Sequence, residues 1–447
     1  MTGDSTIERN GTCAEVDALS ERFGKMAAIV AHYTAMTMLQ ARTCADYEEV
    51  RSMYRIGKEE IEEVRKVIKS GQLFRVGEAS SGHLGECDLF EQEWSEKIGS
   101  EYSLLLCGGG TAALVCALAG IGVGPGDEVI VPAYTWLATA TSVLTVGGIP
   151  VLAEVDETMA LDPADFERKI GPKTKAVIPV HMVGRPANLE AIVQIARKHN
   201  LKVVEDSCQM IGGTFKGKRT GTWGDAGAFS FNWFKIISCG EGGALVTDDR
   251  EIYEIASIYS DSGSAFRPKA CELQVPIFVA QQYRADEVMA AIMRVQMKRL
   301  DGILADLRRA RKRFEEEAKA VPGIRVAPSN DPDGDCGVVM ALQFDDEKRA
   351  RAFVDVCPLQ GWLGIDHGKH VYTNWTPLLE KRIMHHPDMN PFNFPQNQGL
   401  RMDYSEEACP KTLELLRRTF FISMNPEWTE DEIKSSSSAL KGALSKV

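Results

Sequence analysis

A single lysine, Lys235, stands at the end of an apolar and aromatic stretch and is followed closely by glycines. Residues 229–235 read Phe-Ser-Phe-Asn-Trp-Phe-Lys, and residues 239–243 read Cys-Gly-Glu-Gly-Gly. Apolar surroundings disfavour the ammonium form, so a lysine held there loses its proton more easily than one in water. A neutral amine can form a Schiff base with an aldehyde. The stretch therefore predicts a nucleophilic lysine; the alternative is a surface lysine at the end of a strand.

A glycine turn lies between an apolar run and a segment of helical character. Tyr102 to Cys107 is the apolar run, Gly108-Gly109-Gly110-Thr111 is the turn, and Ala112 to Ala119 follows. A strand, a glycine turn and a helix together offer backbone N–H groups and a helix N-terminus to a phosphate. The residues from 108 to 113 also satisfy the dinucleotide pattern G-x-G-x-x-A. That pattern requires an acidic residue after the next strand, but Pro-Ala-Tyr-Thr-Trp follows Val129–Val131. The turn is therefore predicted to bind a single phosphate group rather than a dinucleotide.

Three further side chains could serve a flat, charged ligand. Asp206 follows the short apolar run 201–205, and its carboxylate could keep a pyridinium nitrogen protonated; the alternative is a helix cap or a structural ion pair. Trp136 could stack on a ring, although a lone tryptophan is more often a core residue. Ser230 could donate to a phosphate, or could be an ordinary strand hydroxyl.

Apolar runs and helical segments alternate through the first two thirds of the chain. We expect strands at 151–155, 176–181 and 201–205, and a helix at 189–199. Strands separated by such helices predict an α/β fold whose mostly parallel sheet is covered on both faces. Ligands of such sheets bind beyond the carboxyl ends of the strands. The residues expected at that edge are Thr111, Trp136, His181, Asp206 and Lys235.

A long charged helix over residues 294–320 is expected to connect this sheet to a smaller part of mixed α and β structure. The predicted organisation is an N-terminal helical extension at 1–54, a large domain at 55–310 and a small C-terminal α+β domain at 311–447. Residues 361–401 are expected to be irregular, and no role follows for the extension.

Composition limits the classes of function. The chain has 447 residues and a formal charge of −12, which argues against nucleic acid or an anionic membrane as a partner. We see no apolar run long enough to cross a bilayer and no secretory signal. Its 11 cysteines include no C-x-x-C pair. Scattered, unpaired cysteines predict reduced thiols and a cytoplasmic protein.

Five motifs occur in an order that resembles one family. They are Gly-Gly-Thr-Ala-Ala-Leu, Pro-Ala-Tyr-Thr-Trp, Glu-Asp-Ser-Cys-Gln, Gly-Asp-Ala-Gly-Ala-Phe-Ser-Phe with lysine four residues later, and Gly-Glu-Gly-Gly-Ala. This order is similar to that of the DegT/DnrJ-type sugar aminotransferases, which use pyridoxal phosphate (PLP). The resemblance runs from about Ile56 to residues 408–412. It implies PLP fold type I, with a mostly parallel seven-stranded sheet between helices in the large domain.

The resemblance also implies a role for each matching residue. Lys235 would bond to the cofactor and carry protons, and Asp206 would pair with the pyridine nitrogen. Gln209 would contact the ring hydroxyl, and Trp136 would stack on the ring. The remaining cofactor-binding residues implied are Gly110, Thr111 and Ser230 for the phosphate, His181 at the border of the cofactor, and Arg284 in the motif that reaches a neighbouring subunit.

Several positions depart from the family pattern. Gly109 stands where serine or asparagine is usual, and Gln282 where asparagine is common. The segment before Tyr54 is longer than the family's. Sister enzymes that dehydrate sugars have histidine where this chain has Lys235, so the lysine favours transamination. Residues 152–158 and 201–213 look most like the aminotransferases of eight-carbon keto-sugar acids.

The irregular C-terminal region contains a cationic group, His367, Lys369 and His370, where the substrate would be selected. Such a loop suits an anionic sugar. The H-x-x-H spacing is also a possible metal pattern, but no cysteine or carboxylate cluster completes a ligand set, so no metal is predicted. His385 and His386 fit a solvated turn.

The resulting hypothesis is a homodimeric, PLP-dependent aminotransferase with a shared active site. It would move an amino group from an amino acid, glutamate or glutamine, to a keto or aldehyde sugar in two half reactions. Two alternatives stay open on the same cofactor: another reaction such as dehydration, decarboxylation or cyclisation, and a non-catalytic PLP-binding regulator. A nicotinamide dehydrogenase is a more distant alternative.

Overall fold

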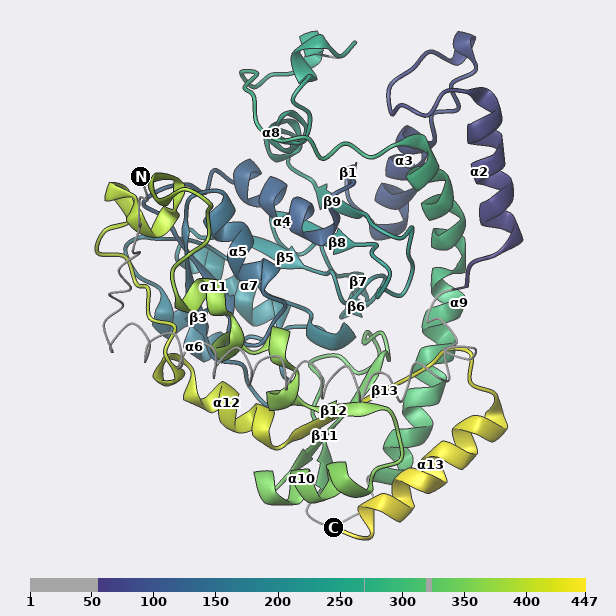
Figure 1. Cartoon of the computed structure of the whole chain (residues 1–447), viewed down its shortest axis with the longest axis vertical. Helices are drawn as coiled ribbons and strands as arrows, with labels where there is room; N and C mark the ends of the chain where they lie inside the picture. Colours follow the sequence, from purple (N-terminus) through teal and green to yellow (C-terminus); the bar gives the residue numbers. More distant parts are fainter. Residues whose placement is uncertain (1–54, 269, 319–323) are drawn as a thin grey trace, which may run out of the picture. The chain divides into compact units, whose positions relative to one another are not determined.

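The structure is a computed structural model that describes residues 55–268, 270–318 and 324–447 (Figure 1). These residues belong to one compact unit, Met53–Val447. The predicted helical extension at 1–54 lies outside the described residues.

The larger sheet has seven strands in the order β1-β9-β8-β5-β4-β2-β3. Only β9 runs against the others, because it pairs antiparallel with both β1 and β8 while the remaining pairs are parallel. This confirms the predicted α/β fold and its mostly parallel seven-stranded sheet. The strands are β1 (Tyr102–Leu106), β2 (Glu128–Pro132), β3 (Ile149–Ala153), β4 (Thr174–Val177), β5 (Lys202–Asp206), β8 (Ala226–Ser230) and β9 (Gly243–Thr247). A two-stranded ribbon, β6 (Thr214–Phe215) and β7 (Lys218–Arg219), lies between β5 and β8 in the sequence.

Both faces of this sheet are buried, as the apolar strands require. Neighbouring residues point to opposite faces of a strand, and Val203 and Val204 of β5 accordingly belong to different hydrophobic clusters. One cluster includes α6 and α7, and the other includes α4 and α5. The helices before the long connector are α2 (Lys58–Ser70), α3 (Glu86–Ile98), α4 (Gly109–Gly120), α5 (Ala138–Thr145), α6 (Pro163–Lys169), α7 (Leu189–Lys198) and α8 (Arg250–Ser260).

Several predicted elements differ in their bounds, such as β3, which runs Ile149–Ala153 rather than 151–155, and two of them differ most. β4 ends at Val177 rather than at 181, since Pro179 has no N–H for the ladder. Pairing continues beyond it through an isolated bridge between Val180 and Asp206. The connecting helix, α9, runs Glu287–Ala318 and so begins seven residues earlier than predicted. Its first turns are apolar, with Ala290, Ala291 and Met293 buried.

Helix α9 passes from the large sheet to a second, antiparallel sheet of four strands in the order β10-β11-β13-β12 (Figure 1). The strands are β10 (Ile324–Val326), β11 (Val339–Phe344), β12 (Gly361–Leu363) and β13 (Thr419–Ser423). The helices of this part are α10 (Glu347–Val356), α11 (Thr376–Leu379), α12 (Pro410–Arg417) and α13 (Glu430–Leu444), together with short 3₁₀ helices between residues 364 and 408. The domain boundary at 310 falls inside α9 and stays a prediction.

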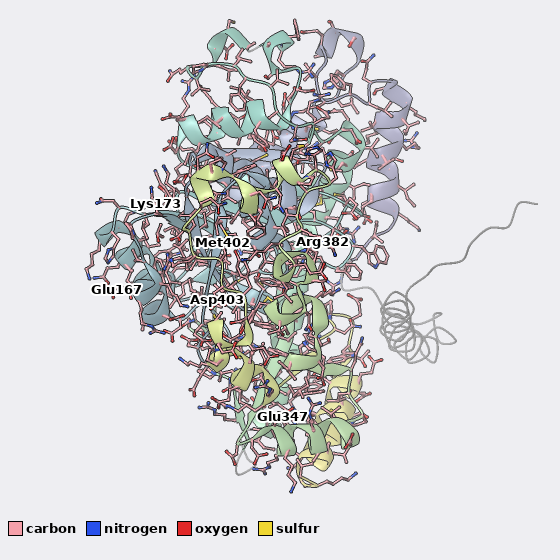
Figure 2. The ribbon with its side chains drawn as sticks, turned by 60° about the vertical axis from the view of Figure 1, so that its left-hand side comes forward. Glu167, Lys173, Glu347, Arg382, Met402 and Asp403 are labelled. Atoms are coloured by element: carbon pink, nitrogen blue, oxygen red, sulfur yellow. The ribbon has the colours of Figure 1, made fainter. Side chains whose placement is uncertain are left out.

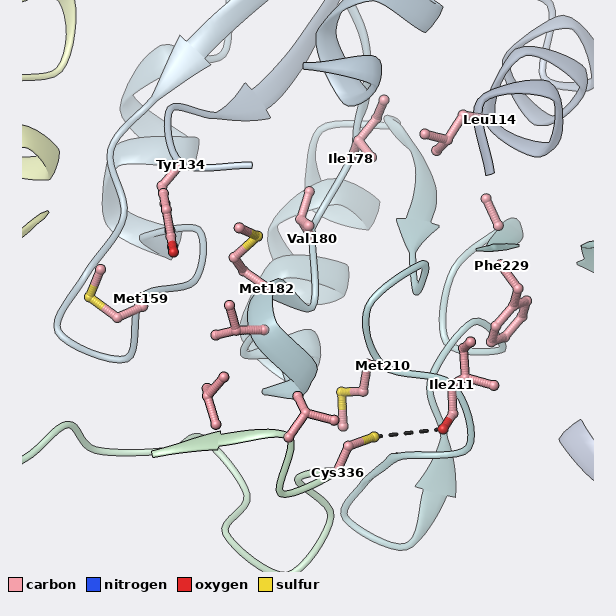
Figure 3. Packing of buried hydrophobic residues seen from close by; sticks show 14 of the residues in the cluster. Leu114, Tyr134, Met159, Ile178, Val180, Met182, Met210, Ile211, Phe229 and Cys336 are labelled. Atoms are coloured by element: carbon pink, nitrogen blue, oxygen red, sulfur yellow. Dashed lines mark hydrogen bonds between the residues drawn. The ribbon is translucent and has the colours of Figure 1, made fainter. Parts of the chain in front are cut away.

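One hydrophobic core continues from the large sheet into the second sheet. Figure 3 shows Cys336, just before β11, against Met210 and Ile211, with its thiol donating to the Ile211 carbonyl at 3.7 Å. The same cluster includes Phe421 of β13 and Tyr134 after β2. The two sheets are therefore packed together where β2 and β5 end.

The irregular segment 382–404 returns from the second sheet to the amino-terminal edge of the large one. Figure 2 marks it by Arg382, Met402 and Asp403. Arg401 forms an ion pair with Glu128, the first residue of β2, and the Tyr404 hydroxyl donates to the Pro150 carbonyl at 3.0 Å. This segment covers one edge of the sheet, and the opposite edge carries the site described next.

Candidate active site

A cavity of about 550 Å³ opens at the carboxyl edge of the large sheet. Seven of the nine sequence-predicted site residues line it: Gly110, Thr111, Trp136, Asp206, Gln209, Ser230 and Lys235. The second sheet and its loops contribute the remaining wall through residues 338, 339, 362, 367, 369, 370 and 423. The cavity therefore lies between the two sheets, where a parallel fold is expected to bind its ligand.

Lys235 follows β8 in a tightly bonded turn. Its N–H donates to the Asn232 carbonyl at 3.0 Å, and the Trp233 N–H donates to the Gly240 carbonyl at 2.9 Å. Burial lowers the pKa of Lys235, and the positive charge of Lys369 lowers it further, whereas Cys208 and Asp206 act in the opposite direction. The turn thus presents an amine that gives up its proton more readily than an exposed lysine.

Asp206 ends β5 and is only 4% exposed. Its carboxylate accepts from the Thr139 hydroxyl at 2.8 Å and from the Cys208 N–H at 3.1 Å. Thr135 and Thr139 share a further hydroxyl bond of 2.7 Å. Within the described ranges, no basic side chain forms an ion pair with this carboxylate. A buried carboxylate without a cation is costly, so the site suits a ligand that brings a positive charge or an N–H group.

The glycine turn forms a close-fitting cradle at the start of α4. Gly109 has a φ of +68°, which favours glycine. A Cβ on Gly110 would stand 2.4 Å from the Cys208 sulfur and 3.1 Å from the Cβ of Ser230. The first N–H groups of a helix have no acceptor within it. Those of α4, beside the Ser230 hydroxyl, suit a phosphate.

Trp136 and Gln209 both line the cavity, the first as an exposed ring and the second as a side chain hydrogen-bonded to the backbone. Trp136 is 44% exposed, so it is not the core residue that was the alternative. The Gln209 side-chain oxygen accepts from the Val183 N–H at 3.1 Å. That bond leaves its NH₂ group as the donor available to a ligand.

His181 and Arg284 are not part of the cavity wall. The His181 ring is fully buried: Nδ1 accepts from the Ala187 N–H at 3.1 Å, so Nε2 carries the proton and donates to Glu205 at 3.2 Å. Arg284 pairs with Asp261, and its guanidinium lies 5.3 Å from the centre of the Phe74 ring. In one chain, therefore, both residues are engaged with protein groups.

Sequence reasoning did not identify the residues that support these groups. Thr139 holds the Asp206 carboxylate, and Glu205 holds His181 while accepting from three backbone N–H groups at 221, 223 and 224. A signal for Thr139 was present, since Thr135 and Thr139 are four residues apart directly after β2. Phe234, Trp362 and Glu241 also line the cavity.

Two other kinds of feature, a metal site and a membrane-spanning helix, are absent from the described residues. Residues 55–268, 270–318 and 324–447 contain no group of three or more His, Cys, Asp or Glu placed to hold a metal ion. No helix among them is long and apolar enough to span a bilayer.

The fold and the lysine-containing cavity define a class of protein. The solved aminotransferase from Psychrobacter cryohalolentis superimposes with a TM-score of 0.71 at 26% identity, over 88% of this chain and 98% of that one. This places the molecule among the PLP-dependent aminotransferases of fold type I, as its sequence predicted.

The chain belongs to the DegT/DnrJ/EryC1/StrS aminotransferase family, whose model matches residues 54–355. It is 30% identical over 390 residues to the spore coat polysaccharide biosynthesis protein SpsC of Bacillus subtilis, covering 85% of this chain and 92% of SpsC. It is 39% identical over 229 residues to GDP-perosamine synthase of Caulobacter vibrioides, covering 51% of this chain and 60% of that enzyme. The predicted family is confirmed.

Proposed function

We propose that this protein binds PLP and transfers an amino group from an amino acid, glutamate or glutamine, to a keto or aldehyde sugar. The observation that carries the proposal is the convergence of Lys235, Asp206 and the Gly108–Thr111 turn on one cavity. The names of the relatives support a sugar-type acceptor, since one makes a perosamine nucleotide and another serves polysaccharide synthesis.

The residues present fit the cofactor in charge and in shape. The buried Asp206 carboxylate forms no ion pair with any basic side chain that the structure describes, and it suits a protonated ring nitrogen. The start of α4 and Ser230 suit the phosphate, and the exposed face of Trp136 suits the ring. When bound, PLP supplies an aldehyde and an electron-withdrawing ring.

The chain's own groups would then control protons and position. The Lys235 amine, with its lowered pKa, is able to bond to a carbonyl carbon and to take up and return a proton. Asp206, oriented by Thr139 and the Cys208 N–H, would keep the ring nitrogen protonated. The NH₂ group of Gln209 would donate to the ring hydroxyl.

The proposal includes a homodimer in the cytoplasm. Phe266 is 88% exposed and Val279 81% exposed, and both belong to the segment that leads to Arg284. Large exposed apolar residues in one segment support an interface between subunits. Light scattering during size-exclusion chromatography should give a dimer, and a monomeric protein with full activity would contradict this part.

The main test is the absorbance of the purified protein with PLP. The wild type should show the visible absorbance band of a cofactor bonded to a lysine. Addition of glutamate or glutamine should convert that band to the pyridoxamine form, and a keto sugar should restore it. Lys235→Ala should lose both the band and turnover, whereas Lys348→Ala, on the exposed face of α10, should keep both.

A conversion of substrate without formation of pyridoxamine phosphate would favour another PLP reaction. A normal band in Lys235→Ala would refute the role of this lysine.

A further inference from the structure

A lysine of the second sheet's loops, Lys369, lines the cavity together with Trp362, His367 and His370. Its ammonium lies 5.2 Å from the centre of the Trp136 ring and 5.6 Å from that of Phe234. Both aromatic residues line the same cavity. Throughout the described part of the chain, no carboxylate forms an ion pair with Lys369, so aromatic faces are its partners.

The position of Lys369 is set by its main chain. The Trp375 indole N–H donates to the Lys369 carbonyl at 3.0 Å, and Trp375 itself is buried. On the next residue, the His370 carbonyl accepts from the Thr135 N–H at 3.1 Å, which joins the loop to the segment that carries Trp136. The loop therefore places the Lys369 ammonium at the cavity, although no carboxylate among the described residues pairs with it.

Two histidines beside Lys369 add hydrogen-bonding capacity but no charge. The rings of His367 and His370 lie 4.2 Å apart, and the Nδ1 atom of each is buried without a hydrogen-bond partner in the described structure. Burial, with the nearby Lys369 charge, lowers the pKa of His367 to about 4 and that of His370 to about 2. Both rings are neutral near pH 7, so Lys369 is the cation of this wall.

We infer that Lys369 binds an anionic oxygen group of the substrate, a carboxylate or a phosphate, at the cavity wall formed by the loops of the second sheet. The inference rests on the proposed function and extends it to the charge of the substrate. A lysine ammonium binds such groups as a point charge, and it is most effective where no protein carboxylate competes. The two possible sources are the carboxylate beside the amine of the amino donor and a charged group on the sugar acceptor.

The first experiment measures the donor source. Stopped-flow absorbance should follow the half reaction of PLP-loaded enzyme with L-glutamine, whose only carboxylate lies next to its amine. If the donor is the source, Lys369→Met should raise the apparent Kd for L-glutamine about tenfold or more. Lys369→Arg should keep most of the affinity for L-glutamine. Lys348→Met, on the exposed face of α10, should match the wild type.

The second experiment measures anion binding without turnover. Titration calorimetry of the PLP-loaded protein with inorganic phosphate, and separately with acetate, should give heats that Lys369→Met reduces and Lys348→Met does not. Loss of phosphate binding with an unchanged Kd for L-glutamine would assign Lys369 to a charged acceptor. Loss of acetate and L-glutamine affinity would assign it to the donor.

Three results would overturn the inference. The first is an unchanged affinity of Lys369→Met for L-glutamine, acetate and phosphate. The second is an absence of anion binding in the wild type. The third is a Lys369→Met variant in which only the pKa of Lys235 changes. Failure of the proposed function is read separately, as the absence of the visible cofactor band in the wild type.

Discussion

The two walls of the cavity are built in different ways. The wall at the large sheet consists of short motifs at strand ends, and its polar groups are bonded to nearby backbone or hydroxyl groups, as Asp206 is to Thr139 and the Cys208 N–H. The wall at the second sheet is a loop whose main chain is held, and in the described structure the Nδ1 atoms of His367 and His370 are buried without a hydrogen-bond partner. The first arrangement fixes reacting groups in place, and the second leaves groups free for a variable ligand.

The largest effect is expected at Asp206. Asp206→Asn keeps the shape of the side chain but cannot hold the proton on a ring nitrogen. Removing such an electrostatic contribution should lower kcat by about 100-fold or more. Because this buried carboxylate forms no ion pair with a basic side chain among the described residues, the thermal midpoint of the protein without cofactor should stay unchanged or rise. Steady-state kinetics and thermal unfolding check the two parts; a large fall in the midpoint would contradict the account of the site.

The next effect tests the cradle of the glycine turn. Gly110→Ala would place a Cβ 2.4 Å from the Cys208 sulfur. Such overpacking should cost about 1–3 kcal/mol of stability and weaken PLP binding. Chemical denaturation and fluorescence titration with PLP measure these changes.

The matched control is Gly124→Ala, where an added Cβ meets nothing within 4 Å. The double variant Gly110→Ala/Cys208→Ala should recover part of the loss. Absence of any recovery would show that the sulfur is not the obstacle.

A smaller effect should follow from Thr139→Val. The substitution keeps the shape of the side chain but removes the hydroxyl that donates to Asp206. The loss of one hydrogen bond to a charged group should cost about 1.5–3 kcal/mol, which corresponds to a fall of at least about tenfold in kcat/KM for the donor. Thr145→Val removes a hydroxyl that, among the described residues, donates to the Thr141 carbonyl in the same helix and has no role at the cavity. Equal kinetics for the two variants would remove Thr139 from the site.

The smallest effect concerns the stability of the folded protein at acidic pH, to which His370 in the cavity wall contributes. His370 has a folded pKa lowered to about 2 by burial, below its usual value of 6.5. Between these values the unfolded chain binds more protons than the folded one, so stability falls as the pH decreases from about 6.5. His370→Asn should reduce that loss, measured by urea denaturation at pH 7 and pH 5. The exposed His385→Asn should retain the wild-type slope, and an unchanged slope in His370→Asn would contradict the burial argument.

The sequence predicted the sheet wall of the cavity better than the contacts that support it. The glycine turn, Asp206 and Lys235 each lie within a few contiguous residues at a strand end, so local pattern and fold class were sufficient to bring them to one edge. The bond from Thr139 to Asp206 joins residues 67 positions apart, and Lys369 meets Trp136 from another part of the chain. Such pairs depend on how the elements pack.

The sequence pattern also predicted the wrong end for β4. Pro179 has no N–H, and whether this ends the strand depends on whether a neighbouring strand offers a carbonyl at that position. The role of each site residue toward the cofactor stays a prediction that the variants above will test.

Trp375 and Thr135 hold the Lys369 loop by hydrogen bonds, and this has a consequence for how substrate specificity can diverge. Because those bonds use the carbonyls of residues 369 and 370, exchanging the side chains at 367 or 369 does not remove them. New substrate preferences can therefore arise by a few substitutions in this loop, while the lysine, the carboxylate and the glycine turn stay as they are.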